Sequence, residues 1–169
     1  MLIEISKSVR LKLTSIYDEI MWLAQRPGVK PAAARAWYTH IVHRVVTLEI
    51  RSFTGNVSVE AVTDETSSLR LEHFKRIQTT LTQLVARHLA SQAHDADEFI
   101  ETVVDCEQVH IVTEAENYAA MKAKGDYALA GIKLFDWKQI PQERRRVLWK
   151  KMLNGRVSNA REFAVEPLL

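Results

Sequence analysis

The longest uninterrupted helical pattern of hydrophobic residues lies between residues 69 and 90. Apolar side chains recur there every three or four positions, at Leu71, Phe74, Ile77, Leu81, Leu84, Val85 and Leu89. This spacing places them on one face of an α-helix, and neither glycine nor proline interrupts the pattern. A helix with one wide apolar face needs other elements to cover it. We therefore expect a central helix at about 69–90, with His88 inside its buried stripe.

Similar spacing predicts helices on both sides of this segment. One is expected at about 5–25, because Arg26-Pro27-Gly28 would end it. A second is expected from Pro31 to about residue 51, although the β-branched residues of its second half also fit a strand. A third, basic and amphipathic, is expected at about 140–153, with Ile140, Leu148 and Met152 facing inward and Arg144, Arg145 and Lys151 facing outward.

Other segments indicate strands and a helix start. Residues 57–62 alternate as in a strand after the turn-like Thr54-Gly55-Asn56, and residues 109–112 fit a short buried strand. Thr113 and Glu116 fit a capping box, which places a helix start at Glu114. The expected fold class is mainly α, with α+β as the alternative: a helical domain around the helix at 69–90 and a short strand or hairpin near 57–62 and 109–112.

We expect two parts along the chain. Residues 1–132 would form a single helical domain, and residues 133–169 a basic C-terminal helical arm packed on it or extending from it. The 169 residues suit one domain with such an appended arm.

Composition narrows the possible classes of protein. Cys106 is the single cysteine, so a disulfide within the chain and a cysteine-based structural zinc site are both excluded. Charged residues interrupt the apolar positions of the first 15 residues, and no apolar run approaches the ~20 residues of a membrane span. We therefore expect a cytoplasmic protein without a membrane partner.

The charges are distributed unevenly. Eight acidic residues and no lysine or arginine lie between Ser91 and Asn117, whereas nine basic and two acidic residues lie between Lys133 and Arg161. Such an arrangement suits a basic surface that meets a polyanion, or acidic and basic surfaces that meet each other. The candidate nucleic-acid contacts are Arg144, Arg145, Lys150, Lys151 and Arg156, which would pair with phosphates without reading sequence.

Three short motifs carry a resemblance to a known family. They are Leu71-Glu72-His73, Val112-Thr113 with Glu116-Asn117, and Tyr127 with Ala130-Gly131-Ile132. Over roughly 69–132 this order resembles small bacterial and phage proteins whose layout is similar to a degenerate HNH nuclease. The resemblance implies that His73 is the general base, Asn117 an orienting residue and Glu72 a ligand of a divalent metal. No cofactor is expected unless this nuclease alternative holds, and the residues alone predict no metal site.

A separate pair of residues resembles the motif of another nuclease family. Arg35 and His40 have the Arg-x4-His spacing of HEPN ribonucleases, which are helical and often dimeric. His40 and His43 also share a helix face, but no nearby acid completes a ligand set.

Two functional hypotheses remain open at this point. The first is a non-enzymatic helical interaction protein of phage, plasmid or defence type, acting through protein contacts with a partner or as a homodimer. The alternative is a domain that binds or processes nucleic acid, with a degenerate HNH-like or HEPN-like site. For His73, as for His88, the residues also fit a purely structural role.

Overall fold

Two compact units make up the chain, and each is assembled from separate stretches of sequence. The computed structural model describes residues 5–165. The helical unit contains the chain up to Ile50 and Lys75–Glu107, and the sheet unit contains Arg51–Phe74 and the chain from Gln108 onward. The predicted boundary at residue 132 does not separate them, because residues on both sides of it belong to the sheet unit. The fold is α+β and mainly helical.

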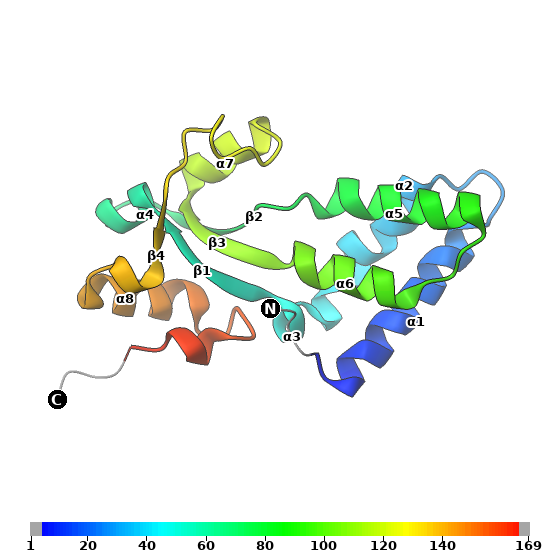
Figure 1. Ribbon diagram of the computed structural model, residues 1–169, viewed down its shortest axis with the longest axis horizontal. Helices are drawn as coiled ribbons and strands as arrows, with labels where there is room; N and C mark the ends of the chain where they lie inside the picture. Colours follow the sequence, from blue (N-terminus) through cyan, green and yellow to red (C-terminus); the bar gives the residue numbers. More distant parts are fainter. Residues whose placement is uncertain (1–4, 166–169) are drawn as a thin grey trace. The chain divides into compact units, whose positions relative to one another are not determined.

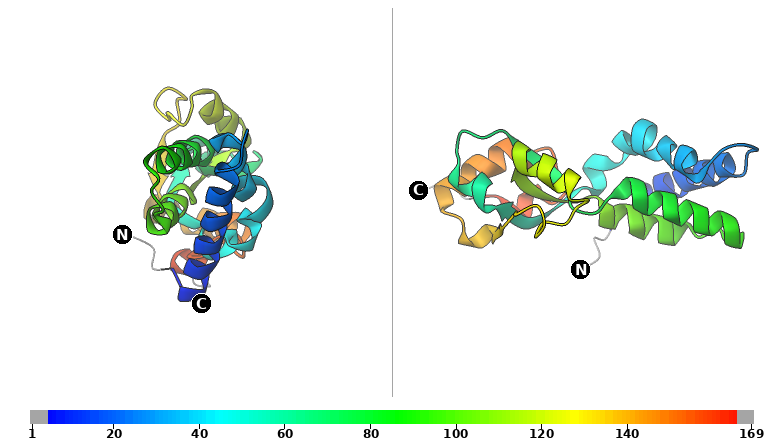
Figure 2. Two further views of the ribbon diagram at one scale, coloured as in Figure 1. Left: turned by 90° about the vertical axis from the view of Figure 1, so that its right-hand side faces the viewer. Right: turned by 90° about the horizontal axis from the view of Figure 1, so that it is seen from above.

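The helical unit confirms the helices expected at about 5–25 and from Pro31 to about residue 51. Its elements are α1 (Lys7–Ala24), α2 (Pro31–Ala36), the π-helix η1 (Trp37–Val42), the 3-10 helix η2 (His43–Val45), α3 (Thr47–Ile50), α5 (Ile77–Ser91) and α6 (Ala96–Cys106). The segment after Pro31 is therefore helical rather than a strand, in a succession of helix types. Helices α1, α5 and α6 lie side by side (Figures 1 and 2).

The core of the helical unit forms where the apolar stripes of these helices meet. Leu13 and Ile20 from α1, Leu81 and Val85 from α5, and Phe99 from α6 are all completely buried. Their positions three, four or seven residues apart within each helix place them on one face. The apolar spacing of residues 77–89 therefore identified a true core helix.

The predicted start of the central helix is wrong. Residues 69–73 form strand β2 (Leu69–His73), and α5 begins at Ile77. Leu69 and Leu71 alternate with polar neighbours and face the core of the sheet unit, whereas Arg70 is exposed. Alternate residues of a strand share one face, so this short stretch satisfies both a helical and a strand pattern. Pairing with a distant strand decides between them.

The sheet unit contains four strands in the order β2-β3-β1-β4. Its elements are β1 (Ser52–Ser58), α4 (Val59–Thr63), β2, β3 (Gln108–Thr113), α7 (Glu114–Lys122), β4 (Leu134–Asp136), the 3-10 helix η3 (Trp137–Gln139), α8 (Gln142–Leu148), the π-helix η4 (Trp149–Leu153) and the 3-10 helix η5 (Ala160–Phe163). Strand β3 pairs with β1 in parallel and with β2 in antiparallel orientation, and β4 is antiparallel to β1.

Strand β1 corrects the prediction for residues 54–62. The expected turn at Thr54-Gly55-Asn56 lies inside β1, and the expected strand 57–62 ends at Ser58, after which α4 begins. The pairing register with β3 shifts between Phe53 and Val57, and Gly55 has φ +86°. Glycine adopts this conformation without the penalty of a side chain, so it accommodates a bulge here rather than a turn.

The two faces of the sheet differ in character. One face carries Phe53, Val109 and Ile111 and packs against Leu148 and Leu153 of the C-terminal helices. Helices α7 and α8 lie on opposite sides of the sheet (Figure 1).

The predicted strand at 109–112 and the predicted capping box of α7 are both confirmed. Among the described residues, no helix is both long and apolar enough to cross a membrane.

Candidate functional site

Strand β2 places the predicted catalytic pair Glu72 and His73 on opposite faces of the sheet. Glu72 pairs with His110 of β3, and His73 pairs with Val109. Because successive side chains of a strand alternate between faces, His73 shares a face with the core residue Val109. Glu72 is 2% exposed on the other face, where the Tyr127 hydroxyl donates a hydrogen bond to its carboxylate. The pair therefore does not act on one point in space.

Asn117, the third predicted catalytic residue, lies on α7. The side-chain amide nitrogen of Asn117 contacts Met121 Sδ at 4.0 Å within the same helix. It forms no hydrogen bond with Glu72 or His73. Across the described residues, no group of three or more His, Cys, Asp or Glu side chains is arranged to hold a metal ion. The residues implied by the HNH resemblance thus do not fit a divalent metal, and we derive no reaction step through one.

A buried polar cluster on the Glu72 face of the sheet was not predicted. The Thr54 hydroxyl lies 2.6 Å from His110 Nδ1, and the Phe74 ring stacks on the His110 ring with centroids 4.7 Å apart. The Tyr127 ring meets His110 edge-on and joins it to Glu72 through the hydroxyl bond. A histidine in the middle of the otherwise apolar Val109–Val112 strand was the available sequence signal.

Burial keeps His110 uncharged at neutral pH. The side chain is 7% exposed, and desolvation of the imidazolium lowers the pKa of His110 to about 4. The carboxylate of Glu72 and the hydroxyls of Thr54 and Tyr127 are engaged within the cluster. The cluster therefore fastens the segment containing Tyr127 to the sheet, which is a structural role.

Arg144 is the clearest error among the predicted nucleic-acid contacts. It was expected on the outer face of its helix, but it is 7% exposed. One terminal nitrogen of its guanidinium donates to the carbonyl oxygens of Ala61 at 2.6 Å and Asp64 at 3.1 Å. Arg144 therefore holds α8 against the C-terminal end of α4 and is not available to a ligand.

The other predicted basic contacts lie at the surface of the sheet unit. Lys150, Lys151 and Arg156 are exposed, and Arg145 is half-buried. Within residues 5–165, seven cations of this segment form no ion pair with a carboxylate: Lys133, Lys138, Arg145, Lys150, Lys151, Arg156 and Arg161. We call these seven residues the basic surface.

Several acids of the acidic segment form ion pairs with other parts of the chain. In the helical unit, Asp97 pairs with Arg10, Asp105 with Lys75, and Glu98 with both Arg87 and His88; in the sheet unit, Glu114 pairs with Arg70. Each of these bases lies outside the basic surface. The acidic and basic blocks seen in the sequence are therefore not joined by these ion pairs.

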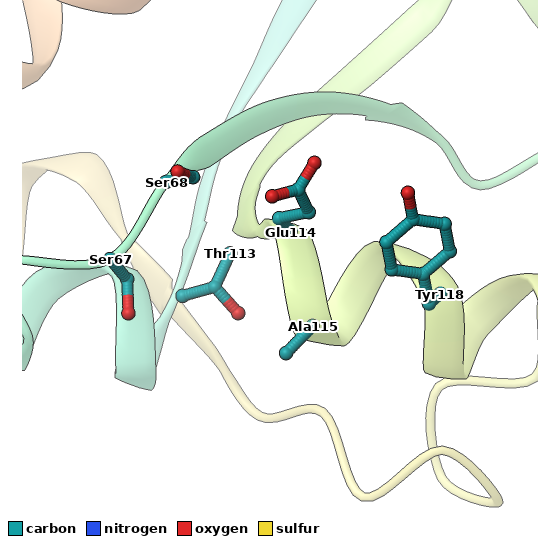
Figure 3. A pocket seen from close by; sticks show the side chains of 6 residues that line it. All are labelled: Ser67, Ser68, Thr113, Glu114, Ala115 and Tyr118. Carbon is teal, nitrogen blue, oxygen red and sulfur yellow. The ribbon is translucent and has the colours of Figure 1, made fainter.

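A surface pocket of about 370 Å³ lies where β2 begins and α7 starts. It is lined by Ser67, Ser68, Thr113, Glu114, Ala115 and Tyr118 (Figure 3). The Glu114 carboxylate is bonded to Arg70, and the Ser67 hydroxyl to Asp64. Thr113 caps α7. Most of the polar groups around this pocket are thus committed to the fold.

The arginine of the HEPN-like pair is held by hydrogen bonds within the helical unit. Arg35 Nε donates to the Thr82 hydroxyl at 3.0 Å, and its terminal nitrogen donates to Thr39 at 2.9 Å. Arg35 therefore joins α2 to α5, while His40 is exposed on η1.

Comparison with known proteins adds no relative to this description. No family model, no curated protein and no solved structure matches the chain.

Proposed function

We propose that the protein binds nucleic acid through the basic surface of its sheet unit, without cutting it. The supporting observation is that this surface consists of cations without carboxylate partners within residues 5–165, although several acids of the preceding segment pair with bases elsewhere in the chain. An array of lysine and arginine side chains favours a polyanion, because phosphates displace the counterions that such an array otherwise holds. Arg145, Lys150, Lys151 and Arg156 remain the proposed contacts.

The geometry of β2 supports binding rather than cleavage. A nuclease of the HNH type needs a general base and a metal ligand on the same side of the scissile phosphate. Glu72 and His73 point to opposite sides of the sheet, and the Glu72 carboxylate is held by Tyr127. A role in structure accounts for both side chains.

Charge reversal on the basic surface tests this proposal. Fluorescence anisotropy with labelled duplex DNA, single-stranded DNA and RNA would compare the wild type with Lys150→Glu/Lys151→Glu. We expect a loss of affinity of about tenfold or more, since several phosphate contacts are removed or made repulsive. Lys7→Glu/Lys30→Glu is the matched control, because both lysines are exposed and lie in the helical unit.

The same samples test the absence of cleavage. Plasmid DNA and RNA incubated with Mg²⁺ or Mn²⁺ should remain intact at protein concentrations that saturate binding. Cleavage that His73→Ala abolishes, with the melting temperature unchanged, would contradict a purely binding role and favour the HNH-like alternative.

A second candidate function rests on one further observation. Ile41, Val45 and Leu48 are 58%, 60% and 61% exposed and follow one another at spacings of three and four residues in the helical unit. An exposed apolar stripe is typical of a surface that contacts protein. This supports an interaction protein or homodimer, for which light scattering would show a mass above 19.4 kDa that Val45→Lys reduces to the monomer.

A further inference from the structure

A pocket of about 280 Å³ is lined by Lys138 and Arg145 of the basic surface and lies entirely within the sheet unit. Strand β1 contributes Gly55, η3 contributes Trp137 and Lys138, α8 contributes Arg145, and η5 contributes Glu162 and Phe163. Its volume is just below the roughly 300–1,000 Å³ of typical small-molecule sites. The pocket therefore suits a single flat group the size of a nucleobase.

Aromatic rings form the apolar part of this pocket. Trp137 and Phe163 meet edge to face with ring centroids 5.9 Å apart, and Phe53 contacts both from the core. Phe163 also packs over Gly55, where an added Cβ would stand 3.5 Å from its ring. These contacts fix the aromatic side chains, so a ligand would meet a preformed wall.

Arg145 and Lys138 are the two cations of this pocket, and Arg145 has a buried, unused donor. Its Nε is buried and has no hydrogen-bond partner among the described residues, and the guanidinium forms no ion pair there. No hydrogen bond of the terminal guanidinium nitrogens occurs among the described residues either, so these donors are unused. Arg145 therefore offers donors to a phosphate or base oxygen.

Two carboxylates also line the pocket, and they distinguish it from a simple anion site. The Asp136 carboxylate already accepts a hydrogen bond from the Lys138 backbone N–H at 2.8 Å. The Glu162 side chain has no such partner within the described part of the chain. Carboxylates accept hydrogen bonds from the exocyclic amino groups of bases. A ligand with both an anionic and an amino-bearing part satisfies the whole set.

We infer that this pocket receives one unpaired nucleotide of a bound single strand, whose base carries an exocyclic amino group. Arg145 donates to its oxygen atoms, Glu162 accepts from its amino group, and the base lies against the Trp137 and Phe163 wall. Bases in a duplex are stacked and paired, so a loop, an end or a single strand must supply this nucleotide. The inference rests on the proposed nucleic-acid binding and names its substrate class.

Three labelled 12-residue DNA strands separate this inference from general polyanion binding: oligo-dC, oligo-dT and a strand with abasic sites. All carry the same phosphates, whereas only cytosine combines a base with an exocyclic amino group. We expect the wild type to bind oligo-dC at least about fivefold more tightly than the other two at equal salt.

Three variants assign any preference to the pocket. Arg145→Leu and Glu162→Leu should each remove the preference for oligo-dC, because the donor or acceptor proposed for the base is then lost. Lys151→Gln, which removes one charge outside the pocket, should weaken binding of all three strands equally and keep the preference. Circular dichroism melting would establish that every variant is folded.

The remaining outcomes are distinct. Equal, salt-sensitive binding of all three strands would overturn the nucleotide pocket and leave the proposed polyanion binding intact. An oligo-dC preference that survives both pocket variants would also overturn the pocket. No binding of any strand would contradict the proposed function and this inference together.

Discussion

Arg144 and Arg145 are neighbours on α8 with opposite environments. The guanidinium of Arg144 donates to the Ala61 and Asp64 carbonyl oxygens, whereas Arg145 lines the proposed nucleotide pocket without an ion pair among residues 5–165. Both side chains carry the same charge, but Arg144 stands four residues before the buried Leu148 and therefore on its face of the helix. The contacts of Arg144 assign it to stability, whereas Arg145 is the residue proposed to contact a ligand.

This difference predicts separate effects of the two substitutions. Arg144→Ala should lower the free energy of unfolding of the sheet unit by about 1–3 kcal/mol, because two carbonyl groups lose a charged donor inside the protein. Arg145→Ala should change it much less. Urea denaturation followed by circular dichroism measures both, and equal destabilisation by the two substitutions would refute the assignment.

The hydrogen bond between Tyr17 and His88 should contribute to the free energy of unfolding of the helical unit. The Tyr17 hydroxyl lies 2.6 Å from His88 Nδ1 and accepts from the Asp95 N–H, and His88 Nε2 lies 2.7 Å from Glu98. Tyr17→Phe should therefore cost about 1–3 kcal/mol, because buried groups lose their partner. Tyr118→Phe is the matched control, since Tyr118 is exposed. A cost no larger than that of the control would contradict this network.

Leu81 tests the helical core directly. Leu81 is completely buried, so Leu81→Ala should lower the free energy of unfolding by about 2–5 kcal/mol through lost apolar contact and the remaining cavity. Thr79→Ala on the exposed face of the same helix should have a small effect. A loss below about 1 kcal/mol at Leu81 would show that α5 is not in the core.

His110 predicts a pH dependence of the sheet unit. Its pKa is about 4 in the folded protein, against 6.5 as the ordinary value. Between these two values the unfolded chain binds a proton that the folded chain does not. Stability should therefore fall as the pH decreases from 6.5 to 4, by up to about 1.4 kcal/mol per pH unit from this residue.

Substitution of the histidine isolates that contribution. Denaturation of the wild type and of His110→Gln across this pH range should give a smaller slope for the variant. Identical slopes would mean that His110 titrates normally in the fold.

Local patterns predicted much of this fold. Helix α1, strand β3, the capping box of Thr113 and the burial of His88 all follow from residues close in sequence. Strand β2 did not, because Leu69 and Leu71 fit two periodicities and β3, the strand that pairs with them, lies more than 30 residues further along the chain. Because of the same ambiguity, the helical pattern of α5 extends back through Phe74 into β2.

The candidate site was harder to predict. The Glu72-His73 motif does not reveal that its side chains point to opposite faces, which only the strand conformation establishes. In the basic segment, Ile140, Leu148 and Met152 are buried as expected, but Arg144 is buried with them. Arg144 stands four residues after Ile140 and four before Leu148, so regular helical spacing places it on their buried face, and only its charge suggests the outer face.

The salt dependence of nucleic-acid affinity tests the central claim most directly. Anisotropy titrations of single-stranded DNA at several salt concentrations should give a linear fall of log affinity with log salt. Each neutralised phosphate contributes about 0.7 to that slope for a single strand, so Lys150→Ala/Lys151→Ala should reduce the slope by about 1.4. An affinity independent of salt, or a slope unchanged in the double variant, would contradict binding by the basic surface.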